Sequence, residues 1–167
     1  PADILPLWIA DMDFKTSSYV QDALKEVVEH GIFGYSEALS DYYVAVREYF
    51  QKKYNYDFEE RELIKTPGVV FAIAVAVRSL TNEGDAVMIQ SPVYYPFSAT
   101  IEHNGRKVVD STLTYDEKEN RYVIDFKDFE QKIIDNDVRL FLLCNPHNPV
   151  SRVWSKEELL KLGDICL

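Results

Sequence analysis

The sequence has little of what several common classes of protein require. Its two cysteines are too few for a disulfide framework, and its three histidines are scattered rather than spaced as zinc ligands, so we expect no metal site. No apolar run approaches the roughly 18–20 residues that cross a bilayer, which argues against a membrane partner. No dense Lys/Arg cluster offsets the net charge of −10, which argues against a nucleic-acid partner.

What remains is the composition of a globular domain. Of the 167 residues, 47% are hydrophobic and 28% are charged, which is enough for one domain with a substantial core. Cys144 and Cys166 both lie in apolar stretches, far apart in the sequence. We interpret them as reduced core thiols, which predicts a cytoplasmic protein.

Hydrophobic periodicity predicts two helices followed by alternating strands and helices. The helices are expected at residues 17–30, 39–54, 69–80, 97–103, 126–134 and from 155 onward. The strands are expected at residues 63–65, 85–90, 107–110 and 139–144, with a loop or hairpin at 115–122. This order predicts an α/β fold with a mainly parallel sheet and helices on both faces.

Two of these helices have unusual apolar surfaces. The helix at 69–80 is almost unbroken in its apolarity, which predicts burial nearly all round. The helix at 39–54 carries an aromatic stripe, Tyr42, Tyr49 and Phe50, which we assign to the core or to a subunit interface. Ser155 and Glu158 have the spacing of a capping box, which marks the start of the last helix.

Three turns that follow or precede the predicted strands offer complementary groups for one ligand. Tyr94 follows the strand at 85–90 and supplies an aromatic ring, and Asn148 follows the strand at 139–144 and supplies an amide. Gly68, with the N–H groups of Val69 and Val70, opens a helix whose positive end suits a phosphate. A flat ring, a polar substituent and a phosphate together describe pyridoxal phosphate.

Each signal also has a plain structural interpretation. Tyr94 can be a packing residue at a strand–helix junction, Asn148 can belong to an ordinary Asn-Pro turn, and Gly68 can simply begin a helix. The carboxylates of Asp11 and Asp13 suit acid–base work, although fixing a turn is the favoured interpretation. The convergence of three turns on one ligand, rather than any turn alone, favours the cofactor site.

Five blocks of sequence carry a resemblance to a known family. They are residues 7–14 (LWIADMDF), 31–35 (GIFGY), 67–70 (PGVV), 90–97 (QSPVYYPF) and 142–149 (LLCNPHNP). In this order they resemble the MalY/PatB-type cystathionine β-lyases, which are aminotransferase-like, fold-type-I pyridoxal-phosphate enzymes. The resemblance implies that residues 1–36 form an N-terminal arm and first helix. It also implies that residues 37–167 form the N-terminal part of the cofactor-binding large domain.

The resemblance also implies roles for individual residues. Tyr94 matches the tyrosine that stacks on the cofactor ring, and Asn148 matches the asparagine that bonds the cofactor's phenolic oxygen. Residues 68–70 match the helix start that holds the phosphate. Tyr35 matches a tyrosine that reaches the phosphate of the neighbouring subunit in a homodimer. Ala10 and Asp11 match the loop that lines the substrate side.

The sequence departs from the family pattern in two ways. Ser151 stands where the family usually has glycine, so it is strained if that position needs a positive φ. The family also has, further along, an Asp for the pyridine nitrogen, a Lys that bonds covalently to the cofactor and an Arg for the substrate carboxylate. None of Lys107, Lys118, Lys127 or Lys132 lies in a matching context. We therefore expect that the chain is part of a longer protein and is inactive alone.

The resemblance implies a choice between functions. The leading one is α,β-elimination on an amino-acid substrate such as cystathionine or cysteine, which yields a thiol, ammonia and pyruvate. The first alternative is an aminotransferase of class I/II. The second, of a different class, is a non-catalytic fragment that binds or interacts.

Overall fold

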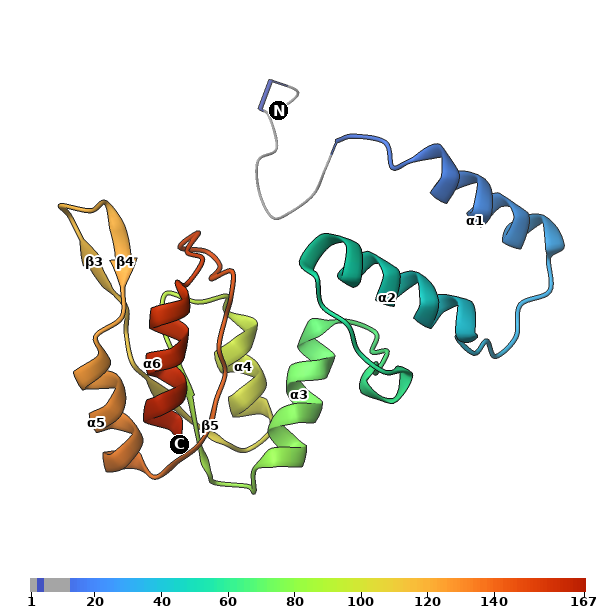
Figure 1. Cartoon of the computed structure of the whole chain (residues 1–167). Coiled ribbons are helices and arrows are strands. Elements are labelled where there is room, and N and C mark those ends of the chain that lie inside the picture. The colour runs from blue at the N-terminus through green and yellow to red at the C-terminus, as the bar shows by residue number, and fades with distance from the viewer. Residues whose placement is uncertain (1–2, 5–12) are drawn as a thin grey trace. The chain divides into compact units, whose positions relative to one another are not determined.

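The computed structural model describes residues 3–4 and 13–167 (Figure 1). The chain forms two compact units, residues 1–63 and 64–167. No helix among the described residues is both long and apolar enough to cross a membrane.

The first unit contains two helices, α1 (Ser18–His30) and α2 (Ser40–Tyr54), as predicted. Helix α1 ends at Gly31, whose φ of 71° is the left-handed conformation that stops a helix. Neither helix has a buried residue, and the aromatic stripe of α2 is partly exposed. Within this unit, therefore, the stripe is not core.

The chain after α2 folds back onto that helix. Arg47 binds Asp57 through hydrogen bonds of 2.5 and 2.8 Å, and this pairing lowers the pKa of the Asp57 carboxyl. The Tyr43 hydroxyl donates to the carbonyl of Phe58 over 3.0 Å. A 3-10 turn, η1 (Glu60–Glu62), then closes the segment with a capping box between Glu59 and Glu62.

The strand predicted at residues 63–65 is wrong. Leu63 caps η1 through a backbone hydrogen bond to Glu60, and residues 63–65 join no sheet among the described residues. A strand exists only where a neighbour pairs with it, and so short a segment cannot reveal whether one is present.

The second unit is built on a three-stranded parallel sheet, as predicted. Strand β1 (Ala86–Ile89) lies in the centre, between β2 (Lys107–Asp110) and β5 (Val138–Phe141). Both neighbours run parallel to β1, with Val87 opposite Val108 on one side and Leu140 on the other. All four residues of β1 are buried, which explains its continuous apolar sequence.

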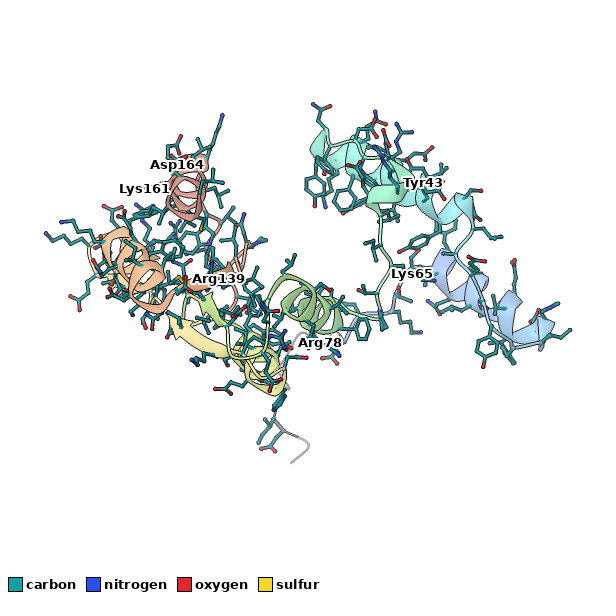
Figure 2. All side chains as sticks on the ribbon, turned by 90° about the horizontal axis from the view of Figure 1, so that it is seen from below. Tyr43, Lys65, Arg78, Arg139, Lys161 and Asp164 are labelled. Carbon is teal, nitrogen blue, oxygen red and sulfur yellow. The ribbon has the colours of Figure 1, made fainter. Side chains whose placement is uncertain are left out.

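Helices cover both faces of this sheet (Figures 1 and 2). On one face, α3 (Val69–Leu80) and α4 (Pro96–His103) cover Val87 and Ile89. On the other, α5 (Phe126–Asn136) and α6 (Lys156–Cys166) cover Ala86 and Met88. Alternate residues of β1 therefore supply two separate cores. The segment at 115–122 is a hairpin of β3 (Thr114–Asp116) and β4 (Arg121–Val123).

The predicted capping box at the start of α6 is confirmed. The Ser155 hydroxyl accepts from the Glu158 N–H over 3.2 Å, and the Glu158 carboxylate accepts from the Ser155 N–H over 2.7 Å. Cys166, however, is exposed at the end of this helix and is not a core thiol, since Leu162 provides the buried contact. The predicted burial of α3 is also wrong. Only Val77 is fully buried, because one side of the helix packs on the sheet and on α4.

Candidate cofactor site

Two of the predicted turns lie side by side at one edge of the sheet. Strands β1 and β5 are parallel neighbours, so the turns that follow them emerge at the same edge. Val93 and Pro149 form an isolated antiparallel bridge between these turns. A ring nitrogen of His147 also lies 3.1 Å from the carbonyl oxygen of Pro92. The turn that carries Tyr94 is therefore joined to the turn that carries Asn148.

The turn before Tyr94 is held by the end of the neighbouring strand. The Asp110 carboxylate accepts from the backbone N–H and the hydroxyl of Ser91, over 2.8 and 2.5 Å. The Thr112 hydroxyl donates to the same carboxylate over 3.1 Å. Tyr94 itself leads into α4 and is 42% exposed, so part of its ring remains available to a ligand.

Asn148 lies in a turn fixed by hydrogen bonds between backbone groups and side chains. Its N–H donates to the sulfur of Cys144 over 3.5 Å. The side-chain oxygen of Asn145 accepts from the backbone N–H of Trp154 over 3.2 Å, and the Trp154 indole donates to the Cys144 carbonyl over 3.0 Å. Asn148 is exposed, so its amide is accessible while its backbone is held.

The start of α3 lies at the same edge of the sheet for topological reasons. This helix packs along β1 and leads into it through residues 81–85, so its N-terminus lies beside the carboxyl end of β1. Gly68 precedes the helix with no side-chain cap, and a Cβ added there would meet nothing within 4 Å. Its φ of 167° is ordinary extended backbone, so open space rather than glycine's conformational freedom characterises the position. The convergence of residues 68–70, Tyr94 and Asn148 on one ligand stays a prediction.

Two buried polar side chains at this edge were missed by the sequence analysis as site residues. Gln90 follows β1 and His147 precedes Asn148, and each is 2% exposed. Neither Gln90 Nε2 nor His147 Nδ1 has a hydrogen-bond partner among the described residues. Burial lowers the pKa of His147, which keeps its imidazole neutral at pH 7. The only available signal was the position of His147 within the block at 142–149.

The remaining predicted site residues cannot be compared with this edge. Ala10 and Asp11, expected on the substrate side, lie outside the described residues. Tyr35 belongs to the first unit, where its side chain is fully exposed. Within the described part of the chain, no group of three or more His, Cys, Asp or Glu side chains could hold a metal ion.

Comparison with known proteins decides the family. The sequence profile of the aminotransferase class I and II family matches residues 2–167. The chain belongs to this family. It is 46% identical over 165 residues to the cystathionine β-lyase PatB of Bacillus subtilis, which covers 99% of this chain and 42% of PatB. It is 30% identical over 166 residues to the protein MalY of Escherichia coli, with 99% and 42% covered.

Solved structures agree with this assignment of fold. A pyridoxal-phosphate-bound putative aminotransferase from Clostridium difficile superposes with a TM-score of 0.91 at 43% identity, covering 99% of this chain and 42% of that one. A pyridoxal-phosphate-bound C–S lyase from Staphylococcus hominis superposes with a TM-score of 0.88 at 35% identity, covering 95% and 41%. The second unit is therefore part of a pyridoxal-phosphate transferase-like fold. The chain spans about 42% of the length of the first relatives it matches.

Ser151, which stands where the family usually has glycine, adopts a positive φ. Its φ is 56°, in the left-handed region, where the Cβ of an L-residue costs about 1 kcal/mol. Ser151 lies in a tight turn that is closed by an antiparallel bridge between His147 and Arg152. In this bridge the His147 N–H donates to the Arg152 carbonyl oxygen over 2.6 Å.

We expect Ser151→Gly to raise the free energy of unfolding by up to about 1 kcal/mol, because glycine adopts this φ without the steric cost. Urea denaturation of the two proteins measures the change. Ser151→Ala is the matched control, since it removes the hydroxyl but keeps the Cβ, and it should gain nothing. Equal midpoints for the Gly and Ala variants would mean that the positive φ costs nothing here.

Proposed function

We propose that this chain supplies part of the cofactor site of a pyridoxal-phosphate-dependent C–S β-lyase. Its substrates would be amino acids such as cystathionine or cysteine, cleaved by α,β-elimination to a thiol, ammonia and pyruvate. The observation that carries the proposal is the contact between the turns of Tyr94 and Asn148 at the carboxyl ends of β1 and β5. The names of relatives such as PatB and the Staphylococcus hominis lyase support the choice of reaction.

The residues at this edge fit pyridoxal phosphate. A doubly charged phosphate needs unpaired donors. The first N–H groups of α3 have no side-chain cap, and residues 68–70 are exposed. A pyridine ring needs an aromatic partner, and Tyr94 is partly exposed. A phenolic oxygen needs a donor, which the exposed amide of Asn148 provides.

When bound, pyridoxal phosphate would supply the electron-withdrawing ring that stabilises negative charge at the substrate's α-carbon. The chain's own residues would orient that ring. We assign stacking to Tyr94, a hydrogen bond to the phenolic oxygen to Asn148, and phosphate binding to the N–H groups of residues 68–70. The Asp110 carboxylate would act through Ser91, by fixing the turn that precedes Tyr94.

The groups that move protons would come from elsewhere in the whole protein. Lys132, for example, is engaged with the carbonyl of Asp110 at 2.6 Å and with the carboxylate of Asp128 at 3.1 Å. We therefore assign no catalytic lysine to this chain. In the whole protein we expect residues 1–36 to be an arm and first helix, residues 37–167 to belong to the large domain, and Ala10 and Asp11 to line the substrate side.

We further infer that the whole protein is a cytoplasmic homodimer in which Tyr35 contributes to the neighbouring subunit's phosphate site. The full exposure of Tyr35 and the partly exposed aromatic stripe of α2 support a subunit interface. The two free thiols support a reducing compartment. Light scattering that found a cofactor-loaded monomer would contradict the dimer.

An aminotransferase is the second candidate. The Clostridium difficile relative is titled a putative aminotransferase, and an aspartate aminotransferase of Sulfolobus acidocaldarius is 28% identical over 164 residues. A non-catalytic fragment that binds or interacts is the remaining alternative, and it would show no turnover in any context.

The whole protein, loaded with pyridoxal phosphate and given cystathionine, should release pyruvate and free thiol in equal amounts without a 2-oxo acid acceptor. An aminotransferase would instead need the acceptor and would release no thiol. Measuring both products with and without acceptor separates the two enzymes. If the cofactor-loaded protein catalyses neither reaction, the non-catalytic alternative remains.

A further inference from the structure

We propose that His147 is a positioning residue, whose imidazole fastens the turn that carries Tyr94 to the turn that carries Asn148. The proposal rests on the proposed function, since it concerns the geometry of the same cofactor site. None of the cofactor contacts proposed for Tyr94, Asn148 and residues 68–70 involves the His147 side chain. His147 itself would not touch the cofactor.

The decisive contact joins two segments that are distant in the sequence. His147 Nε2 lies 3.1 Å from the carbonyl oxygen of Pro92, across a separation of 55 residues. A carbonyl oxygen can only accept, so Nε2 carries the hydrogen and donates it. In a neutral imidazole Nδ1 then has no hydrogen, and among the described residues it has no partner. The bond to Pro92 therefore directs the ring, and the backbone of Gln90 and Cys144 also lies near it.

Packing around the ring removes its freedom to turn away. The imidazole meets the Trp154 ring edge to face, with centroids 5.4 Å apart and planes at 86°. Trp154 is itself buried, and its indole is anchored to the Cys144 carbonyl over 3.0 Å. The Arg152 guanidinium lies 4.6 Å from the centre of the Trp154 ring. The His147 side chain therefore lies in a fixed place between the ends of two strands.

The backbone transmits this position to both cofactor contacts. Asn148 is the next residue after His147, and Tyr94 is two residues after Pro92. A bridge between Val93 and Pro149 joins the two turns directly. The His147 N–H also donates to the Arg152 carbonyl over 2.6 Å, which restrains the turn that carries Asn148. Loss of the imidazole hydrogen bond should therefore change the spacing between the stacking ring and the amide while leaving both groups present.

Two substitutions separate the hydrogen bond from the packing. His147→Phe keeps a flat ring against Trp154 but has no donor, whereas His147→Gln keeps an amide N–H near the Nε2 position but has no ring. His103→Phe is the matched control, because His103 is exposed on α4. All are made in the whole protein and compared by the dissociation constant of pyridoxal phosphate and by the visible circular dichroism of the bound cofactor.

We expect His147→Phe to raise the cofactor dissociation constant about tenfold and to weaken the dichroic band, which reports how the ring is held. His147→Gln should recover most of the affinity, and His103→Phe should behave as the unchanged protein does. A His147→Phe protein with unchanged affinity and dichroism would overturn the proposal. A loss in the Gln variant as large as that in the Phe variant would overturn it too, since a donor at that position would then recover nothing.

The proposal can also be tested on the unsubstituted protein, in case a variant fails to fold. Nitrogen-15 NMR of the cofactor-free whole protein should find the hydrogen of the His147 ring on Nε2. Finding it on Nδ1 would remove the bond to Pro92 and overturn the proposal. Failure of the unchanged protein to bind pyridoxal phosphate would instead contradict the proposed function, so the two failures are distinguishable.

Discussion

The 167-residue chain, mixed with pyridoxal phosphate and cystathionine, should yield no more pyruvate or thiol than the cofactor alone. Free pyridoxal phosphate already reacts slowly, and an enzyme accelerates it by orienting the bond to be broken and by supplying a positioned base. A base contributes about 10²–10⁴-fold, and orientation contributes further. In the proposed site the chain would offer a stacking ring and one amide, but no lysine in the context of a catalytic base.

Turnover by the chain well above the cofactor-only control would show that the catalytic groups have been assigned wrongly. The whole protein, assayed at the same cofactor concentration, is the positive control. Aggregation must be monitored by light scattering in the same samples. Strands β2 and β5 each have a single neighbour among the described strands, and an unpaired strand edge favours association.

In the whole protein, Tyr94→Ala should raise the dissociation constant of pyridoxal phosphate by about 10–100-fold. Stacking on an aromatic ring contributes about 0.5–1.5 kcal/mol beyond the burial of its surface, and the substitution removes both. Equilibrium dialysis or the absorbance of the bound cofactor measures the change. Tyr94→Phe keeps the ring and should bind within a few-fold of the unchanged protein.

Tyr95 provides a control from the same turn. Its ring lies 5.3 Å from that of Tyr94, centre to centre, but it is more exposed. Tyr95→Ala should therefore weaken cofactor binding much less than Tyr94→Ala. If the two alanine variants lose affinity equally, the stacking partner has not been identified correctly.

Much of the fold was accessible from the sequence because the signals were local. The periodicity of α1 and α2, the continuous apolar run of β1 and the Ser155–Glu158 capping box each predicted an element that the structure contains. The alternation of strand and helix then predicted a parallel sheet covered on both faces, which the pairing of β1 confirms. These features depend on neighbours along the chain or on a repeated pattern.

The errors concern partners that are distant in the sequence. Residues 63–65 have the composition of a strand, but no described strand pairs with them. Helix α3 is apolar on all sides, but only the side around Val77 meets the sheet and α4. Cys166 lies in an apolar stretch, yet Leu162 takes the buried position. Composition gives the tendency of a segment to be buried and does not say which neighbour buries it.

The site divides in the same way. Tyr94 and Asn148 were proposed because each follows an apolar strand and because both lie in blocks that resemble a family. The proposed role of His147 was overlooked because it depends on the contact with Pro92, and no pattern in the sequence relates these two residues. Gln90, buried at the end of β1, was overlooked for the same reason. A side chain that connects two turns is recognised only when both turns have been located.

The contact between His147 and Pro92 also limits when the proposed cofactor site can assemble during protein synthesis. The two residues are separated by 55 positions, and the ring of His147 is packed against Trp154, which is made later still. Translation adds about 5–20 residues per second, so the turn of Tyr94 must wait several seconds for its partner. Until β5 has been made, the apolar strand β1 lacks one of its two neighbours in the sheet.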